Sequence, residues 1–96
     1  MNDRQTILTI TGSDSLSESG VQADIKTIAD LGGVSVSAIT SVTVQNTLGI
    51  QEFYDLPAEI VRGQIEALLN DVRPAVIKIG LIRSLPVLDV IVDILA

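Results

Sequence analysis

Residues 7–33 read ILTITGSDSLSESGVQADIKTIADLGG. The β-branched run at residues 7–10 stops at Gly12 and predicts a short buried strand. Residues 13–19 are polar and predict a loop. Residues 20–31 place apolar side chains at the spacing of one helix face, and a glycine pair follows them, as is common after a helix. A strand, a loop and a helix in this order are the opening unit of an α/β fold.

The rest of the chain continues this alternation. We expect, in order, a strand at residues 34–44 with a bend or bulge near Ala38 and Ile39, a turn at 46–49, an extended segment at 50–56, a helix from Pro57 to about Asn70, a strand at 75–79 ended by Gly80, and a helix at 84–96 with Ser84 as its cap. Repeated strand–helix alternation predicts an α/β fold whose sheet is mainly parallel and flanked by helices.

Composition excludes several classes of function. The chain has 96 residues, no Cys, no His and a net charge of −6, and its six Lys and Arg are scattered. Disulfides, thiolate nucleophiles, His-based catalysis and His-ligated metals are therefore absent from this sequence. Nucleic acids and anionic membranes favour a basic surface, so we expect neither as a partner. The polar start Met1–Gln5 does not resemble a signal peptide, and no apolar run is long enough to span a bilayer, so we expect a cytoplasmic protein.

The expected last helix has no terminating signal. Residues 93–96 contain no glycine and no basic residue. Three or four parallel strands would also leave edges that such folds normally cover. We therefore expect residues 1–96 to be the N-terminal, substrate-binding portion of a larger doubly wound domain. The alternative is a small flavodoxin-like binding domain complete at this length.

Two candidate site regions belong to the first strand–helix unit. The loop from Gly12 to Gly20 follows a strand, where open α/β sheets bind ligands, and Ser19 lies in it. It matches neither a Walker loop nor a dinucleotide-binding pattern, so a binding loop and a plain connector are equally supported. Asp24 lies on the apolar helix face. It is either a first-turn acid that complements the helix dipole or an acceptor for a ligand hydroxyl, and the residues alone slightly favour the former.

Two further candidates follow later strands. The amide of Gln45 offers a donor and an acceptor, which suits the ring nitrogen and amino group of an aminopyrimidine, whereas Asn46 is more simply a turn residue. Gly80 would let a ligand approach the backbone closely, and Leu81 would form an apolar wall. The alternative is a plain exit from the strand, with Lys78 as a surface charge.

Four strings of the sequence carry a family resemblance: residues 8–15, 20–27, 37–47 and 78–80. In order and without obvious gaps, they closely resemble the opening of the hydroxymethylpyrimidine/phosphomethylpyrimidine kinases. The resemblance implies a ribokinase-like domain, seen in its N-terminal portion only. It also implies ATP-dependent phosphorylation of hydroxymethylpyrimidine and its monophosphate in thiamine biosynthesis. Pyridoxal kinases share this fold, so a pyridoxal-kinase-like enzyme and a non-catalytic pyrimidine-binding relative are the alternatives.

The resemblance also implies site residues. Asp24 and Gln45 would bind the pyrimidine, and Gly12, Ser19 and Leu81 would line the pocket. The catalytic base and the groups that bind ATP and Mg²⁺ would lie in the other part of the full-length protein, so this segment would hold no catalytic, cofactor or metal residue and be inactive alone. The expected partner is a small aminopyrimidine, and the full-length form is expected to be a homo-oligomer.

One loop departs from the family pattern. Ser17 and Glu18 stand where the family usually has a glycine pair. If those glycines adopt positive φ, the replacement costs about 1 kcal/mol or more. Glu18 would also place a negative charge near the phosphate of the second substrate.

Overall fold

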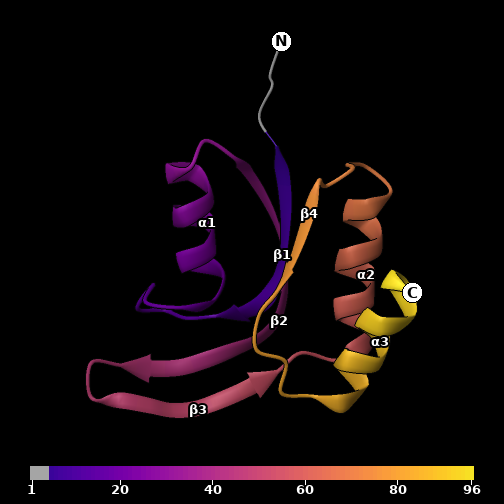
Figure 1. Cartoon of the computed structure of the whole chain (residues 1–96). Helices are drawn as coiled ribbons and strands as arrows, with labels where there is room; N and C mark the ends of the chain where they lie inside the picture. Colours follow the sequence, from indigo (N-terminus) through magenta and orange to yellow (C-terminus); the bar gives the residue numbers. More distant parts are fainter. Residues whose placement is uncertain (1–4) are drawn as a thin grey trace.

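A computed structural model describes residues 5–96 of the chain (Figure 1), so the polar start at residues 1–4 lies outside the described part. Strands and helices alternate as the sequence predicts, which confirms the α/β fold. The elements are β1 (Thr6–Ser13), α1 (Gly20–Asp30), β2 (Val34–Asn46), β3 (Gly49–Asp55), α2 (Ala58–Leu69), β4 (Val76–Ile79) and α3 (Leu85–Leu95). Among the described residues, no helix is long and apolar enough to cross a membrane.

The four strands form one mainly parallel sheet in the order β3-β2-β1-β4. β1 is the central strand and runs parallel to both β2 and β4, with Leu8 opposite Val36 on one side and Ile77 on the other. β3 alone is antiparallel, and it pairs with β2. The carboxyl ends of β1 and β4 therefore meet at the same edge of the sheet.

Helices cover both faces of the sheet (Figure 1). Successive strand residues point to opposite faces, so Leu8 and Ile10 face α2 and α3, while Thr9 faces α1. The buried core between the sheet and the helix pair α2 and α3 consists of Leu8, Ile10, Ala38, Val61, Ile65, Val87 and Ile91. Burial of these aliphatic side chains, at about 25 cal/mol per Å² of apolar surface, is the main force that joins the two layers.

A bulge in β2 follows directly after Ile39. Two steps along β1, from Thr11 to Ser13, correspond to three steps along β2, from Ile39 to Val42. The predicted bulge is thus confirmed, and it lies just after Ile39 rather than at Ala38 and Ile39. Beyond it, β2 leaves β1 and pairs with β3 in a two-stranded ribbon that extends away from α2 and α3 (Figure 1).

A side chain from α2 satisfies the backbone at this bulge. Gln64 Oε1 accepts a hydrogen bond from the Ile39 N–H at 2.8 Å, and Gln64 Nε2 donates one to the Ile39 carbonyl, also at 2.8 Å. Buried backbone groups that leave a sheet ladder need such partners. The glutamine therefore ties the start of the ribbon to the helix layer.

The helix ends follow their sequence signals. Pro57 precedes α2, and Glu59 lies in its first turn. Ser84 caps α3: its Oγ accepts a hydrogen bond from the Val87 N–H at 3.4 Å, and Pro86 lies in the first turn. Both helices begin within one or two residues of the predicted positions.

Candidate functional site

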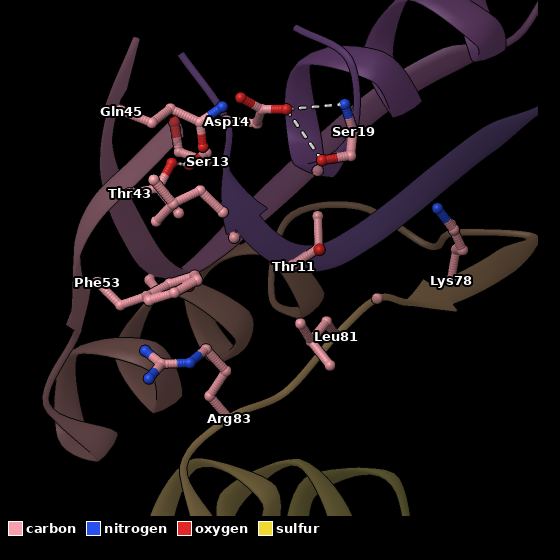
Figure 2. Close-up of a pocket in the computed structure, with 15 residues that line it drawn as sticks. Thr11, Ser13, Asp14, Ser19, Thr43, Gln45, Phe53, Lys78, Leu81 and Arg83 are labelled. Atoms are coloured by element: carbon pink, nitrogen blue, oxygen red, sulfur yellow. Dashed lines mark hydrogen bonds between the residues drawn. The ribbon is translucent and has the colours of Figure 1, made fainter. Parts of the chain in front are cut away.

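A cavity of about 360 Å³ opens at the carboxyl ends of β1 and β4, beside the ribbon (Figure 2). This is the edge at which open α/β sheets usually bind ligands. Its walls come from β1 and the following loop, from both strands of the ribbon, and from the segment that leaves β4. The lining residues are Thr11, Gly12, Ser13, Asp14, Ser19, Gly20, Ser41, Thr43, Gln45, Ile50, Phe53, Lys78, Gly80, Leu81 and Arg83.

The loop between β1 and α1 folds around the buried carboxylate of Asp14. This carboxylate accepts hydrogen bonds from the Leu16 N–H at 3.0 Å, from the Ser19 N–H at 3.0 Å and from Ser19 Oγ at 2.9 Å (Figure 2 shows the two from Ser19). The pKa of Asp14 is lowered, first by the Leu16 N–H, with Ser19 adding to the effect. Donors that stabilise the ionised form act in this direction. The loop thus has a fixed shape that presents Ser19 to the cavity.

Two glycines allow the loop to approach the sheet closely. Gly20 has φ of +67°, and a Cβ built on it would lie 2.5 Å from the Gly12 carbonyl oxygen. A Cβ on Gly12 would lie 2.6 Å from Ser41 Oγ, next to the bulge. A larger residue at Gly20 would push the start of α1 away from the end of β1, and one at Gly12 would push β1 away from β2, so both glycines shape the cavity wall.

Ser17 and Glu18, the two departures in this loop, behave differently. Ser17 has φ of +62° and is the one non-glycine residue of the described chain with positive φ. The predicted strain is therefore confirmed at Ser17 and is absent at Glu18. Glu18 is exposed and does not line the cavity. The prediction that Glu18 places a negative charge beside the ligand is therefore not supported by the cavity lining.

The ribbon is held against the loop by hydrogen bonds. Thr43 Oγ1 donates to the Ser13 carbonyl at 3.1 Å, and Ser15 Oγ donates to the Gln45 carbonyl at 3.4 Å. Gln45 lines the cavity (Figure 2), whereas Asn46 Oδ1 accepts from the Leu48 N–H at 2.9 Å and so serves the turn. The interpretation of Asn46 as a turn residue is confirmed.

Asp24 lies apart from the other predicted site residues. It is the fifth residue of α1, so its interpretation as a first-turn acid is wrong. Its side chain is 12% exposed, and it accepts hydrogen bonds from Thr9 Oγ1 and Lys78 Nζ, each at 2.5 Å. It borders a second cavity on the α1 face of the sheet, together with Lys78. Gly12, Ser19, Gln45 and Leu81 meet in the first cavity, and Asp24 reaches it only through Lys78, which borders both.

Comparison with known proteins identifies a family for this chain. A family model described as phosphomethylpyrimidine kinase matches residues 14–96. The chain belongs to this family. The hydroxymethylpyrimidine/phosphomethylpyrimidine kinase of Haemophilus influenzae is 41% identical over 96 residues, which are 100% of this chain and 36% of that protein. The Bacillus subtilis protein of the same name is 45% identical over 82 residues, which are 85% of this chain and 30% of that protein. The chain thus spans about a third of the length of these relatives.

Solved structures agree with the family assignment and establish a ribokinase-like fold. A phosphomethylpyrimidine kinase from Clostridium difficile superposes with a TM-score of 0.90 at 41% identity, over 94% of this chain and 39% of that one. A pyridoxal kinase from Staphylococcus aureus superposes with a TM-score of 0.77 at 29% identity, over 84% of this chain and 30% of that one. The family prediction made from the four sequence strings is confirmed.

Several cavity residues were not predicted from the sequence, and Phe53 and Arg83 are the two with the strongest mutual contact. Phe53 and Arg83 lie 30 positions apart, yet the Arg83 guanidinium carbon lies 3.9 Å from the centroid of the Phe53 ring (Figure 2). Arg83 Nη1 also donates to both carboxylate oxygens of Asp55, at 3.2 and 3.3 Å. Only the fold-back of β3 brings these side chains together, and nothing in their local sequence marks them.

Proposed function

We propose that the full-length protein transfers a phosphoryl group from ATP to hydroxymethylpyrimidine and to its monophosphate, in thiamine biosynthesis. Residues 1–96 would be the substrate-binding part of one ribokinase-like domain. The observation that carries this proposal is the meeting of Gly12, Ser19, Gln45 and Leu81 in one cavity at the ligand-binding edge of the sheet. These are residues that the family resemblance assigns to the pyrimidine pocket.

The chemistry of the cavity suits an aminopyrimidine. Small-molecule sites combine apolar walls with a few polar groups that fix orientation. Leu81 and Phe53 offer apolar surface to the faces of a flat ring. The Gln45 amide can donate to a ring nitrogen and accept from the exocyclic amino group. Ser19 adds a hydroxyl on the opposite wall, so the ring has partners at its edge and at its faces.

Asp24 enters this proposal as a positioning residue. Its carboxylate holds Lys78 Nζ at 2.5 Å, and Lys78 borders the substrate cavity. Thr9 supplies a second hydrogen bond that fixes the carboxylate between β1 and α1. Asp24 would therefore influence the pyrimidine site by setting where the Lys78 ammonium lies.

ATP and Mg²⁺ are the proposed donor and counterion, and the family resemblance assigns their main binding groups to the other part of the full-length protein. No group of three or more acidic side chains in residues 5–96 is placed to hold a metal ion. The loop after β1 also lacks the Gly-Lys-Ser/Thr sequence of a phosphate-binding loop. The role of this segment is accordingly to hold the acceptor. We further propose a cytoplasmic location and self-association of the full-length form, both on the family resemblance.

A pyridoxal-kinase-like activity is the second candidate, because a pyridoxal kinase superposes well on this chain. The test is calorimetric titration of the full-length protein with hydroxymethylpyrimidine and with pyridoxal, followed by an ATP-dependent phosphorylation assay on each. We expect the pyrimidine to bind more tightly and to be turned over. Tighter binding and faster turnover of pyridoxal would replace the first proposal with the second. Binding without turnover would indicate a non-catalytic relative.

Replacement of Gln45 by Ala tests the pyrimidine site directly. The ring's polar edge would lose its partner, so binding should weaken by about 1–3 kcal/mol, which is roughly 5- to 150-fold. The measurement is calorimetry with hydroxymethylpyrimidine. Gln51→Ala, on the same ribbon but outside the cavity lining, is the control and should bind as the wild type does. Unchanged affinity in Gln45→Ala would remove this residue from the site.

A further inference from the structure

The cavity wall is more positive than the chain as a whole. The protein has a net charge of −6, yet only three of its charged residues line the cavity in the described chain: Asp14, Lys78 and Arg83. The Asp14 carboxylate already accepts hydrogen bonds from donors of its own loop, and the Lys78 ammonium already forms an ion pair with Asp24. Arg83 is thus the charged group of the wall with the most remaining capacity to meet a ligand.

The geometry of Arg83 leaves part of its guanidinium group available. A guanidinium carries five N–H donors in a flat fork, and Asp55 receives hydrogen bonds from Nη1 alone. Phe53 covers one face of the group at 3.9 Å, and the side chain is still 34% exposed. Stacking on Phe53 restricts the orientation of the arginine before any ligand arrives, which reduces the entropy lost on binding, whereas Asp55 competes with a ligand for Nη1.

We propose that Arg83 is a specificity-determining residue, which binds the phosphate of a phosphorylated ligand in this cavity. A guanidinium fork matches a phosphate monoester and forms charge-assisted hydrogen bonds with it. The inference rests on the proposed function, in which the product of the first phosphorylation returns as the substrate of the second. Arg83 makes the cavity favour this anionic ligand over the neutral alcohol.

The test compares two ligands in the full-length protein. Calorimetry measures the affinity for hydroxymethylpyrimidine and for its monophosphate, in wild type and in Arg83→Gln. We expect the variant to lose about 10- to 100-fold in affinity for the monophosphate, because a charge-assisted hydrogen bond is removed, and to change little for the alcohol. The difference should shrink at high salt.

Three further variants separate ligand binding from structure. Arg62→Gln removes an arginine that pairs with Asp93 and does not line the cavity, and it should affect neither ligand. Arg83→Lys keeps the charge without the fork and should restore part of the monophosphate affinity. Asp55→Asn removes the competing carboxylate and should strengthen monophosphate binding, which a merely structural ion pair would not do.

The outcomes distinguish the inference from the function on which it rests. Equal losses for both ligands in Arg83→Gln, or weaker monophosphate binding in Asp55→Asn, would overturn the role of Arg83 while the pyrimidine site stands. If wild type binds neither ligand, both proposals fail together. Circular dichroism verifies that each variant folds, and if Arg83→Gln does not fold, the direction of the Asp55→Asn effect decides.

Discussion

At the scale of single residues, the loop between β1 and α1 combines a stabilising group with a strained one. The buried carboxylate of Asp14 gathers three donors from Leu16 and Ser19. In the same loop, Ser17 has a left-handed backbone conformation that glycine adopts more easily. The hydrogen bonds around Asp14 include one from the Ser17 N–H to the Asp14 carbonyl at 2.9 Å, which helps to maintain the strained conformation.

Replacement of Ser17 by Gly should stabilise the protein by up to about 1 kcal/mol. Positive φ costs an L-residue roughly 1–2 kcal/mol, and the greater entropy of unfolded glycine offsets part of the gain. Urea unfolding measures the difference. Glu18→Gly is the matched control: Glu18 lacks positive φ, so the same change should destabilise slightly. Equal effects at both positions would show that backbone strain at Ser17 does not limit stability.

The stability of this loop should depend on pH through Asp14. Its pKa is lowered in the folded chain from the ordinary value of 3.8, so its contribution is fully present above pH 3.8 and is lost as pH falls through the lower folded value. Unfolding free energy measured between about pH 2 and 5 should fall more steeply in wild type than in Asp14→Asn. Parallel curves for the two proteins would indicate that the pKa of Asp14 does not change on folding.

At the scale of elements, the decisive feature is the bulge that lets β2 serve two neighbours. Its first half belongs to the parallel sheet with β1, and its second half pairs with β3. Because the ribbon turns away from α2 and α3, these helices do not cover it, and every residue of β3 is exposed. One face of this ribbon nevertheless supplies the cavity wall that contains Gln45 and Phe53. The bulge therefore directs the second half of β2, together with β3, to a position where both strands form one wall of the cavity.

The backbone conformation at the bulge should depend strongly on the Gln64 side chain. Gln64→Ala would leave the N–H and the carbonyl of Ile39 without their partner, so we expect a loss of about 2–4 kcal/mol in unfolding free energy. Chemical denaturation measures the loss, and hydrogen exchange at Ile39 should rise with it. Glu66→Ala, an exposed change on the same helix, should cost less than about 1 kcal/mol. A similar small effect at Gln64 would mean that water replaces its amide at no penalty.

At the scale of the whole molecule, the described residues form a cavity at the carboxyl edge of the sheet, which we propose as the acceptor site of the full-length protein. The cavity lies at the end of a sheet in which β4 is an edge strand. The curated relatives of the chain are about three times as long as the chain itself. Phosphoryl transfer depends on positioning and charge stabilisation around the transferred group. Residues 5–96 place no cluster of acidic side chains for the metal that accompanies the nucleotide.

The isolated 96-residue chain should therefore have no kinase activity. An ATP-dependent phosphorylation assay with hydroxymethylpyrimidine should give turnover equal to the blank, while the full-length protein under the same conditions phosphorylates the substrate. Circular dichroism and urea unfolding would establish that the short chain is folded in the assay. Turnover above blank by the folded short chain would show that the acceptor half carries catalytic groups of its own.

Local patterns in the sequence determined the order and type of the elements, because strands and helices repeat apolar side chains with different periods. They also marked the loop from Gly12 to Gly20, Gln45 and Leu81 as candidates, while the assignment of Gly12, Ser19, Gln45 and Leu81 to one pocket came from the family resemblance. Tertiary structure alone decided the rest. The ion pair of Asp24 with Lys78 and the stacking of Arg83 on Phe53 join residues 54 and 30 positions apart. Such contacts arise from sheet order and from the direction of the ribbon after the bulge, and no local period encodes either.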